Sequence, residues 1–263
     1  MRPVPVLMYH HINPHKGDMV TVTPEVFEGQ MAYLHNAGYR TLRIDELVSY
    51  IKGELSLNQK AAVITFDDGW LDNYIYAFPA LKKYSINAAI FIITDRIERA
   101  SLHNERNNPS SVPTHKESKL LIEKKEDYRV ALNWGHIKEM SDSGLVEFYS
   151  HTKSHMKCND LPEDELLEEI GKSKKIIEEK MGRPCPYLCW PYGKYNDTAL
   201  RIAVNTGYEA IFITGHGVVE KGSDPLAIKR IVVKDSVAWF KNKMVIYINP
   251  VLSRLYLMFR KKF

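Results

Sequence analysis

An apolar run that ends in two adjacent aspartates and a glycine restricts the fold of this chain more than any other feature. Residues 61–64 read Ala-Ala-Val-Ile and lead into Thr65-Phe66-Asp67-Asp68-Gly69. Such a run predicts a buried strand that ends in a sharp turn. Because a turn interrupts the alternation of strand side chains, the two carboxylates can take different tasks. One can bind a metal ion while the other handles a proton, although the same residues also suit a turn that only ends a strand.

A pair of histidines four residues apart forms the second cluster. His151-Thr152-Lys153-Ser154-His155 follows the apolar run 145–149. The two imidazoles can converge on one cation if the residues between them form a helical turn, and with one aspartate they leave open positions for water and substrate. Two surface histidines in a polar loop are the alternative. The occurrence of both clusters after predicted strands favours a metal site, because strand ends meet at one face of a barrel.

The remaining sequence predicts alternating helices and strands. We expect helices over residues 24–37, 44–51, 72–84, 134–143, 162–181 and 197–206, and strands over 39–42, 88–93, 187–190, 210–214 and 228–233. Residues 97–128 are polar and interrupt this alternation of helices and strands, so they predict an insertion. It either overhangs the site or is a disordered loop on the surface. A chain of 263 residues with 44% hydrophobic residues is long enough for one such barrel.

Three motifs in this order resemble those of the NodB-homology polysaccharide deacetylases, carbohydrate esterase family 4. The aspartate and histidine clusters look like the first two, and Cys189-Trp190-Pro191-Tyr192-Gly193 resembles a third that in many members reads Arg-x-Pro-Tyr-Gly. The resemblance covers about residues 3–235. It implies an α/β fold, a distorted (β/α)7-type barrel, with one catalytic domain over residues 1–235 that carries the insertion. A C-terminal amphipathic helical segment, residues 236–263, would follow.

The resemblance also implies an activity, the metal-dependent removal of acetyl groups from N-acetylhexosamine units of a glycan or glycolipid. Asp67 matches the catalytic base. Asp68, His151 and His155 match the ligands of a divalent metal ion, for which zinc is expected first and cobalt or nickel are alternatives. The metal would polarise the acetyl carbonyl and activate a water molecule.

The third motif implies the substrate-binding part of the site. Pro191 and Tyr192 match the segment that lines the sugar groove, and the backbone N–H of Tyr192 would help to hold the oxyanion. Trp190 is expected to stack on a sugar ring or to pack in the core. Cys189 stands where many members carry an arginine that orients the base, which leaves the tuning of Asp67 open.

A histidine near the N-terminus is the candidate general acid, because the late Leu-x-His motif of many members is not found. The strand-like run 4–9 ends in His10 and His11 and resembles the subgroup that includes the poly-β-1,6-N-acetylglucosamine deacetylases, as does Lys229-Arg230-Ile231. In that subgroup the first histidine is the suggested acid, so His10 inherits the role. A half-buried histidine bonded to a loop is the alternative. His11 would point the opposite way if the strand continues.

Two other functions remain open at this point. The ligand set also permits an O-acetyl esterase that acts on a decorated polysaccharide. A non-catalytic glycan-binding module on the same scaffold is the other alternative, and the missing arginine and late histidine support it. Asp67 argues against it, because binding alone does not need a base.

Charge and segment composition give the expected partners and location. The net charge of +4 and the absence of an arginine-rich tract indicate no nucleic acid. Met1-Arg2-Pro3 leads directly into a strand with no secretory leader, and no run is long enough to span a bilayer, so we expect a cytoplasmic protein. Residues 239–263 mix aromatic, aliphatic and basic residues around Pro250. They predict two short helices that either pack on the barrel or contact the inner face of the membrane. The oligomeric state is open.

Overall fold

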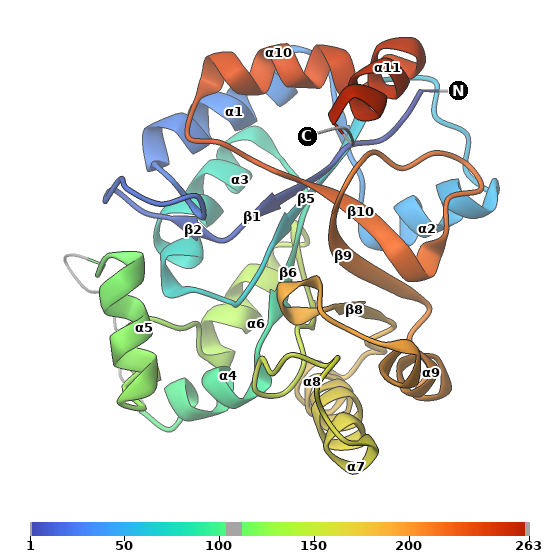
Figure 1. Ribbon diagram of the computed structural model, residues 1–263. Coiled ribbons are helices and arrows are strands. Elements are labelled where there is room, and N and C mark those ends of the chain that lie inside the picture. Colours follow the sequence, from blue (N-terminus) through green and yellow to red (C-terminus); the bar gives the residue numbers. More distant parts are fainter. Residues whose placement is uncertain (1, 104–111, 261–263) are drawn as a thin grey trace.

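Seven parallel strands close into a barrel in the computed structural model, which describes residues 2–103 and 112–260 (Figure 1). The strands are β1 (Val6–Tyr9), β5 (Ala61–Phe66), β6 (Ala88–Ile92), β7 (Val146–Ser150), β8 (Tyr187–Cys189), β9 (Ala210–His216) and β10 (Ile228–Val232). Neighbours follow the order β1-β10-β9-β8-β7-β6-β5, and pairing of β1 with β5 closes the ring. The (β/α)7 barrel predicted from the sequence is confirmed.

Helices cover the outside of the barrel. The helices are α1 (Pro24–Asn36), α2 (Ile44–Lys52), α3 (Phe78–Tyr84), α4 (Thr94–Ser101), α6 (Trp134–Asp142), α7 (Glu163–Leu167), α8 (Ser173–Met181) and α9 (Asp197–Asn205). Of three short strands, β2 (His11–Ile12) and β3 (Thr21–Val22) pair with each other, and β4 (Arg40–Thr41) pairs with the barrel strand β5. The expected elements are therefore present. The helix expected over 72–84 begins as a π-helix, η1 (Asn73–Ala77), and the one over 162–181 contains η3 (Glu168–Lys172).

Burial of the strands explains why the barrel forms. Every residue of β1, β5, β6, β7 and β8 is buried, as expected for parallel strands covered on both faces. Local signals set the helix ends. Asn133 accepts a hydrogen bond from the His136 backbone N–H at the start of α6, and Gly53 ends α2 in the left-handed conformation, with φ of 81°.

The predicted insertion is partly helical. Its described parts are α4, the helix α5 (His115–Glu123) and the 3₁₀ turn η2 (Asp127–Arg129), while residues 104–111 lie outside the described part of the chain. Two hydrogen bonds tie the segment before α5 to the loop after β2: Asn13 donates to the Pro113 carbonyl at 2.8 Å, and the His15 ring lies 3.1 Å from the Val112 carbonyl. The described parts are thus attached to the barrel.

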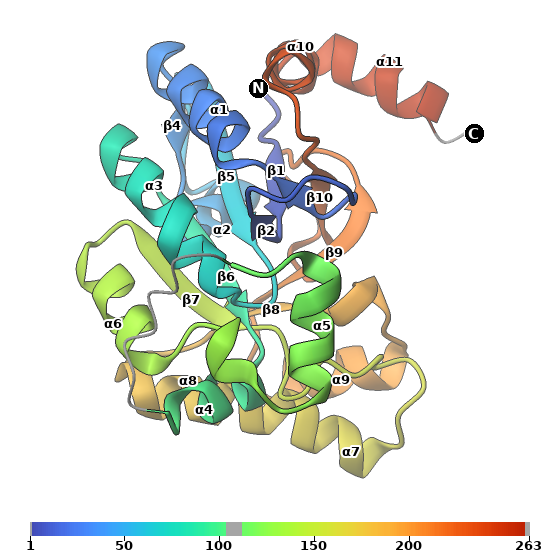
Figure 2. The ribbon, with the colours of Figure 1, turned by 90° about the vertical axis from the view of Figure 1, so that its left-hand side faces the viewer.

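The C-terminal segment forms two helices. α10 (Val237–Tyr247) lies against α1 and buries Phe240, Met244 and Tyr247. α11 (Pro250–Arg260) begins at the proline and extends away from the barrel as a separate arm (Figure 2). None of the described helices has the length and apolar character needed to cross a membrane.

Candidate active site

Three side chains from the ends of two barrel strands converge as a candidate metal centre. Asp68 follows β5, and His151 and His155 follow β7. Asp68 Oδ1 lies 3.7 Å from His151 Nε2 and 3.3 Å from His155 Nε2, and one ligand atom of each residue falls within 4.8 Å of the others. The residues between the histidines form bends, not the helical turn on which the sequence argument relied. The convergence of the rings comes from this bent loop.

The donor atoms of these three residues suit a divalent cation. Asp68 Oδ1 is buried and has no hydrogen-bond partner among the described residues, which is costly unless a cation binds there. His151 Nδ1 lies 2.7 Å from the Cys189 carbonyl, and this contact directs Nε2 towards Asp68. Burial lowers the pKa of His155 to about 3, so its imidazole is neutral at physiological pH, as a metal ligand must be. The pKa of Asp68 is also lowered, because His155 and Arg96 outweigh the effect of burial.

Unusual backbone conformations are concentrated at the motifs. Of the six non-glycine residues with positive φ in the described chain, four belong to them: Asp68 at 73°, Thr152 at 63°, His155 at 70° and Tyr192 at 56°. Such conformations cost free energy and persist only where the surroundings enforce them. Glu169 enforces them in the loop from His151 to His155, because its carboxylate accepts a hydrogen bond from the Ser154 backbone N–H at 2.9 Å.

A buried ion pair fixes the other aspartate. Arg230 on β10 binds Asp67 through two parallel hydrogen bonds, Nη1 to Oδ1 at 2.7 Å and Nη2 to Oδ2 at 2.8 Å, and neither side chain exposes more than 3% of its surface. Burial alone would raise the pKa of Asp67, but Arg230 together with His151 and His10 outweighs it and lowers the pKa to about 2. Asp67 is therefore a carboxylate at neutral pH.

Arg230 holds Asp67 although the third motif of this chain lacks its usual arginine. The sequence left the tuning of Asp67 open because Cys189 replaces the expected arginine, but an arginine from another strand contacts the same carboxylate. Arg230 Nη2 lies 3.0 Å from Cys189 Sγ, so the small thiol leaves room for the guanidinium. The only sequence signal was the Lys229-Arg230-Ile231 segment, which carried a subgroup resemblance and no assigned role.

Asp67, His151 and Cys189 also bring three donor atoms together. A cation there would face the guanidinium of Arg230, which already occupies both oxygens of Asp67. Burial further raises the pKa of Cys189 well above its usual value, so the thiol is protonated and a poor ligand. The cluster of Asp68, His151 and His155 is therefore the candidate metal centre.

The two N-terminal histidines point to different places. His10 Nε2 lies 3.8 Å from Asp67 Oδ2, and the His10 side chain is 22% exposed. His11 is buried and turned the other way, with Nδ1 2.6 Å from Asp72 Oδ2 and Nε2 2.9 Å from His115 Nδ1 on α5. The structure thus brings His10 next to Asp67 and connects His11 to the insertion.

Trp70 follows the two aspartates in the turn after β5. Its ring is 2% exposed and stacks on His11 with centroids 4.3 Å apart, and its Nε1 donates a hydrogen bond to Asp68 Oδ2 at 3.0 Å. Trp70 therefore orients the candidate metal ligand. No sequence pattern gave this contact, because it depends on the turn after β5.

The third motif contributes one exposed side chain. Of the two alternatives for Trp190, the structure shows packing in the core and not stacking on a sugar ring, because the residue is fully buried and its ring stacks on Tyr195 at 5.3 Å. Pro191 is buried as well. Tyr192 is 56% exposed, and its ring centroid lies 4.6 Å from that of His155, so it borders the candidate metal centre.

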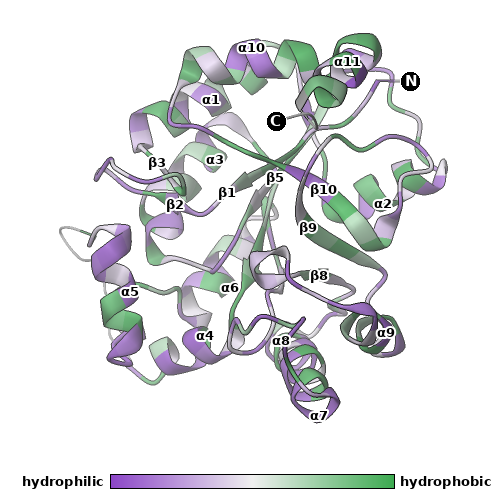
Figure 3. Ribbon diagram, in the orientation of Figure 1, coloured by the Kyte–Doolittle hydropathy of each residue, from purple (hydrophilic) through white to green (hydrophobic). Residues whose placement is uncertain are grey.

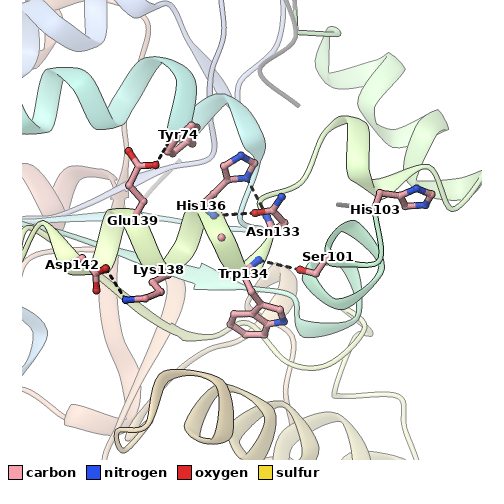
Figure 4. Close-up of a pocket in the computed structure, with 10 residues that line it drawn as sticks. Tyr74, Ser101, His103, Asn133, Trp134, His136, Lys138, Glu139 and Asp142 are labelled. Carbon is pink, nitrogen blue, oxygen red and sulfur yellow. Dashed lines mark hydrogen bonds and ion pairs between the residues drawn. The ribbon is translucent and has the colours of Figure 1, made fainter. Parts of the chain in front are cut away.

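A cavity of about 850 Å³ lies between α6, the end of α4 and η1, away from the motif residues (Figure 4). Its polar groups bind one another: Tyr74 donates to Glu139 at 2.8 Å, and Lys138 pairs with Asp142 at 2.7 Å. Its lining residues offer no ligand set of the kind found around Asp68, so the motif cluster remains the candidate site.

Comparisons with known proteins agree with this geometry. A family model described as polysaccharide deacetylase matches residues 55–211. The putative polysaccharide deacetylase YxkH of Bacillus subtilis is 30% identical over 235 residues, which cover 89% of this chain and 73% of the relative. The chain belongs to the polysaccharide deacetylase family. It is therefore an enzyme, a hydrolase that removes acetyl groups from sugar units.

Two further relatives support the membership and the fold. The poly-beta-1,6-N-acetyl-D-glucosamine N-deacetylase of Staphylococcus aureus is 28% identical over 225 residues, which cover 82% of this chain and 68% of the relative. The Streptococcus pyogenes deacetylase PplD, solved in complex with acetate, superposes with a TM-score of 0.77 at 24% identity and covers 94% of this chain and 99% of that one. The deacetylase shares the barrel fold of PplD.

Proposed function

We propose that the enzyme hydrolyses the acetamide of N-acetylhexosamine units with Asp67 as the general base. The observation that carries this proposal is the position of Asp67. Its carboxylate is held by Arg230, lies 3.8 Å from His10, and adjoins the candidate metal ligand Asp68 in the chain. An ionised carboxylate in contact with an ionisable imidazole provides the two proton-transfer groups that amide hydrolysis needs.

Asp68, His151 and His155 would hold a divalent cation, for which we propose zinc, with cobalt or nickel as replacements. Bound there, the cation would supply Lewis acidity, which polarises the acetyl carbonyl and lowers the pKa of water from about 16 towards 7. Trp70 and the Cys189 carbonyl support the arrangement, because they orient Asp68 and His151.

Residues of the chain itself carry out the remaining steps. Asp67 takes a proton from the attacking water, and Arg230 keeps the carboxylate oriented for that transfer. The backbone N–H of Tyr192 stabilises the oxyanion of the tetrahedral intermediate. His10 then donates a proton to the departing amine, and acetate leaves. The partial exposure of His10 suits this task, because its ring can reach both substrate and solvent.

The proposed substrate is a polymer or glycolipid that contains N-acetylglucosamine. This part rests on the relative from S. aureus, whose name states that it acts on poly-β-1,6-N-acetyl-D-glucosamine. The exposed ring of Tyr192 beside His155 supports it, because an aromatic face next to the reacting centre can contact a sugar ring.

Acetate release from N-acetylglucosamine oligomers with β-1,6 and β-1,4 linkages tests the proposal. The protein is stripped of metal and reloaded with zinc, cobalt or nickel, and free amine is measured alongside acetate. Asp67→Asn should lower turnover by about 10²–10⁴-fold, the usual contribution of a general base, while zinc affinity stays close to that of the wild type. Asp68→Asn is the matched change and should instead weaken zinc binding.

Circular dichroism and the melting temperature establish that both variants fold, since Asp67→Asn leaves a buried arginine without its anion. Turnover retained in Asp67→Asn would remove Asp67 from the role of base. Metal binding without acetate from any oligomer would contradict the proposed substrate class.

A further inference from the structure

The outer helix α11 presents its apolar face to solvent, which is the reverse of an ordinary surface helix. Five large apolar side chains of α11 are 42–66% exposed: Val251, Leu252, Leu255, Met258 and Phe259. Their spacing of three, four, seven and eight residues places them on one face. Figure 2 shows this helix extending beyond the barrel, and Figure 3 colours much of it as hydrophobic.

The opposite face attaches the arm to the barrel. Ser253 is fully buried, and the ring of Tyr256 lies 5.8 Å from that of Tyr247 on α10. Lys243 lies over the Tyr256 ring at 3.9 Å, and Arg254 pairs with Glu220 at 3.5 Å. The helix is therefore held in an orientation that leaves its apolar side uncovered by the other residues that the structure describes.

Charge indicates what covers this face. Residues 237–263 contain no aspartate or glutamate, and their basic residues are Lys241, Lys243, Arg254, Arg260, Lys261 and Lys262. Lys241 and Arg254 are exposed: Lys241 lies over the Tyr33 ring of α1, and Arg254 is on α11 itself. A second copy of the chain would bring the same cations together, whereas an anionic lipid surface complements them and accepts the apolar side chains.

We propose that α11 is an interfacial helix that attaches the deacetylase to membranes containing anionic phospholipids. Val251, Leu252, Leu255, Met258 and Phe259 insert among the acyl chains, and basic residues of this segment, Arg254 among them, contact the phosphate groups. The helix lies in the plane of the interface and does not cross the bilayer, in agreement with its eleven residues. The catalytic barrel then works on substrate close to a lipid surface.

Co-sedimentation of the full chain with lipid vesicles tests this inference. One set of vesicles contains phosphatidylcholine alone, and the other contains phosphatidylcholine with phosphatidylglycerol. The wild type should bind the anionic vesicles, and raised salt should weaken the binding because ions screen the charges. The double variant Leu255→Ser with Met258→Ser should lower the affinity at least 10-fold.

A matched control changes the same residue types elsewhere. Leu167 on α7 is 53% exposed and Met19 is 88% exposed, so Leu167→Ser with Met19→Ser removes similar apolar surface outside α11. This control should bind vesicles like the wild type. In the same way, Lys241→Glu with Arg254→Glu should lower binding to anionic vesicles, while Lys175→Glu with Arg201→Glu should lower it less.

Three results would overturn the proposal. The wild type could fail to bind anionic vesicles, or the variant of Leu255 and Met258 could bind as well as the wild type. Sedimentation equilibrium could instead show a dimer that this variant abolishes, in which case a second copy covers the face. Acetate release from a soluble oligomer, measured in parallel, shows that the α11 variants fold, and it separates failure of this inference from failure of the proposed activity.

Discussion

Arg230 and Asp67 face each other across the barrel interior as a bidentate ion pair, joined by contacts of 2.7 and 2.8 Å and closed to solvent. The pair links β10 to the end of β5, two strands that are not neighbours in the ring. The planar guanidinium fixes both oxygens of the carboxylate, which a lysine cannot do. The orientation of the proposed base therefore depends on a residue more than 160 positions later in the chain.

Arg230→Lys should lower kcat by roughly 10- to 100-fold, because the charge remains but the two-point contact is lost. The zinc dissociation constant should stay close to that of the wild type. Arg230→Met should in addition destabilise the fold by about 3–5 kcal/mol, since it leaves a buried carboxylate without its partner. Lys229→Met, at the exposed neighbouring position on the same strand, is the control.

The pH profile separates orientation from simple destabilisation. Arg230 is the main cause that lowers the pKa of Asp67 to about 2, so its removal lets burial raise that pKa. The acidic limb of kcat/KM in Arg230→Met should move to higher pH, because the base becomes protonated sooner as pH falls. If the acidic limb of kcat/KM stayed at the same pH as in the wild type, Arg230 would not control the pKa of the proposed base.

The elements and motifs were predictable from the sequence because they depend on local signals. The apolar run that forms β5 lies directly before Asp67 and Asp68, and the run that forms β7 lies directly before His151. The partner of Asp67 was not predictable in the same way. It required knowing that β10 returns to the interior of the barrel with Arg230 pointing inward, which is a tertiary contact.

Burial also decided which aromatic residues belong to the site. Trp190 and Tyr192 are two positions apart in the third motif, and both suit sugar stacking by chemistry. The chain reverses at Tyr192, where φ is 56°, so the tyrosine faces solvent while the tryptophan lies in the core. A residue type alone cannot give that difference, because it arises from the turn.

His10→Gln tests the proposed general acid. Turnover of an N-acetylated sugar should fall by about 10²–10⁴-fold, because the departing amine needs a proton. Hydrolysis of 4-nitrophenyl acetate should fall far less, since nitrophenolate leaves without protonation. His35→Gln, an exposed change on α1, should affect neither reaction. Equal losses on both substrates would contradict the role of His10 as the acid.

Trp70→Phe tests the support of the candidate metal ligand. Phenylalanine can keep the stacking on His11 but cannot donate the hydrogen bond that Trp70 Nε1 makes to Asp68 Oδ2 at 3.0 Å. Loss of such a bond typically weakens metal binding by about 10- to 100-fold, which competition with a chelator would measure. Trp134→Phe is a matched control, because Trp134 Nε1 also donates to a carboxylate, that of Glu98, outside the site. Equal zinc affinity in the two variants would show that Trp70 has a packing role only.

His115→Gln tests whether the contact between α5 and His11 affects stability in acid. Burial, with the nearby charges of His11 and Lys119, lowers the pKa of His115 from 6.5 to about 4, although Asp18 acts in the opposite direction. Between these values the unfolded chain binds a proton that the folded chain does not, so stability falls as pH decreases from 6.5 towards 4.

Glutamine at position 115 cannot take up that proton and can still contact His11 Nε2. The urea midpoint should therefore decrease less between about pH 7 and pH 4.5 in His115→Gln than in the wild type. His35→Gln makes the same substitution at an exposed position, and an equal decrease in all three proteins would show that the insertion does not contribute to the acid sensitivity of the fold.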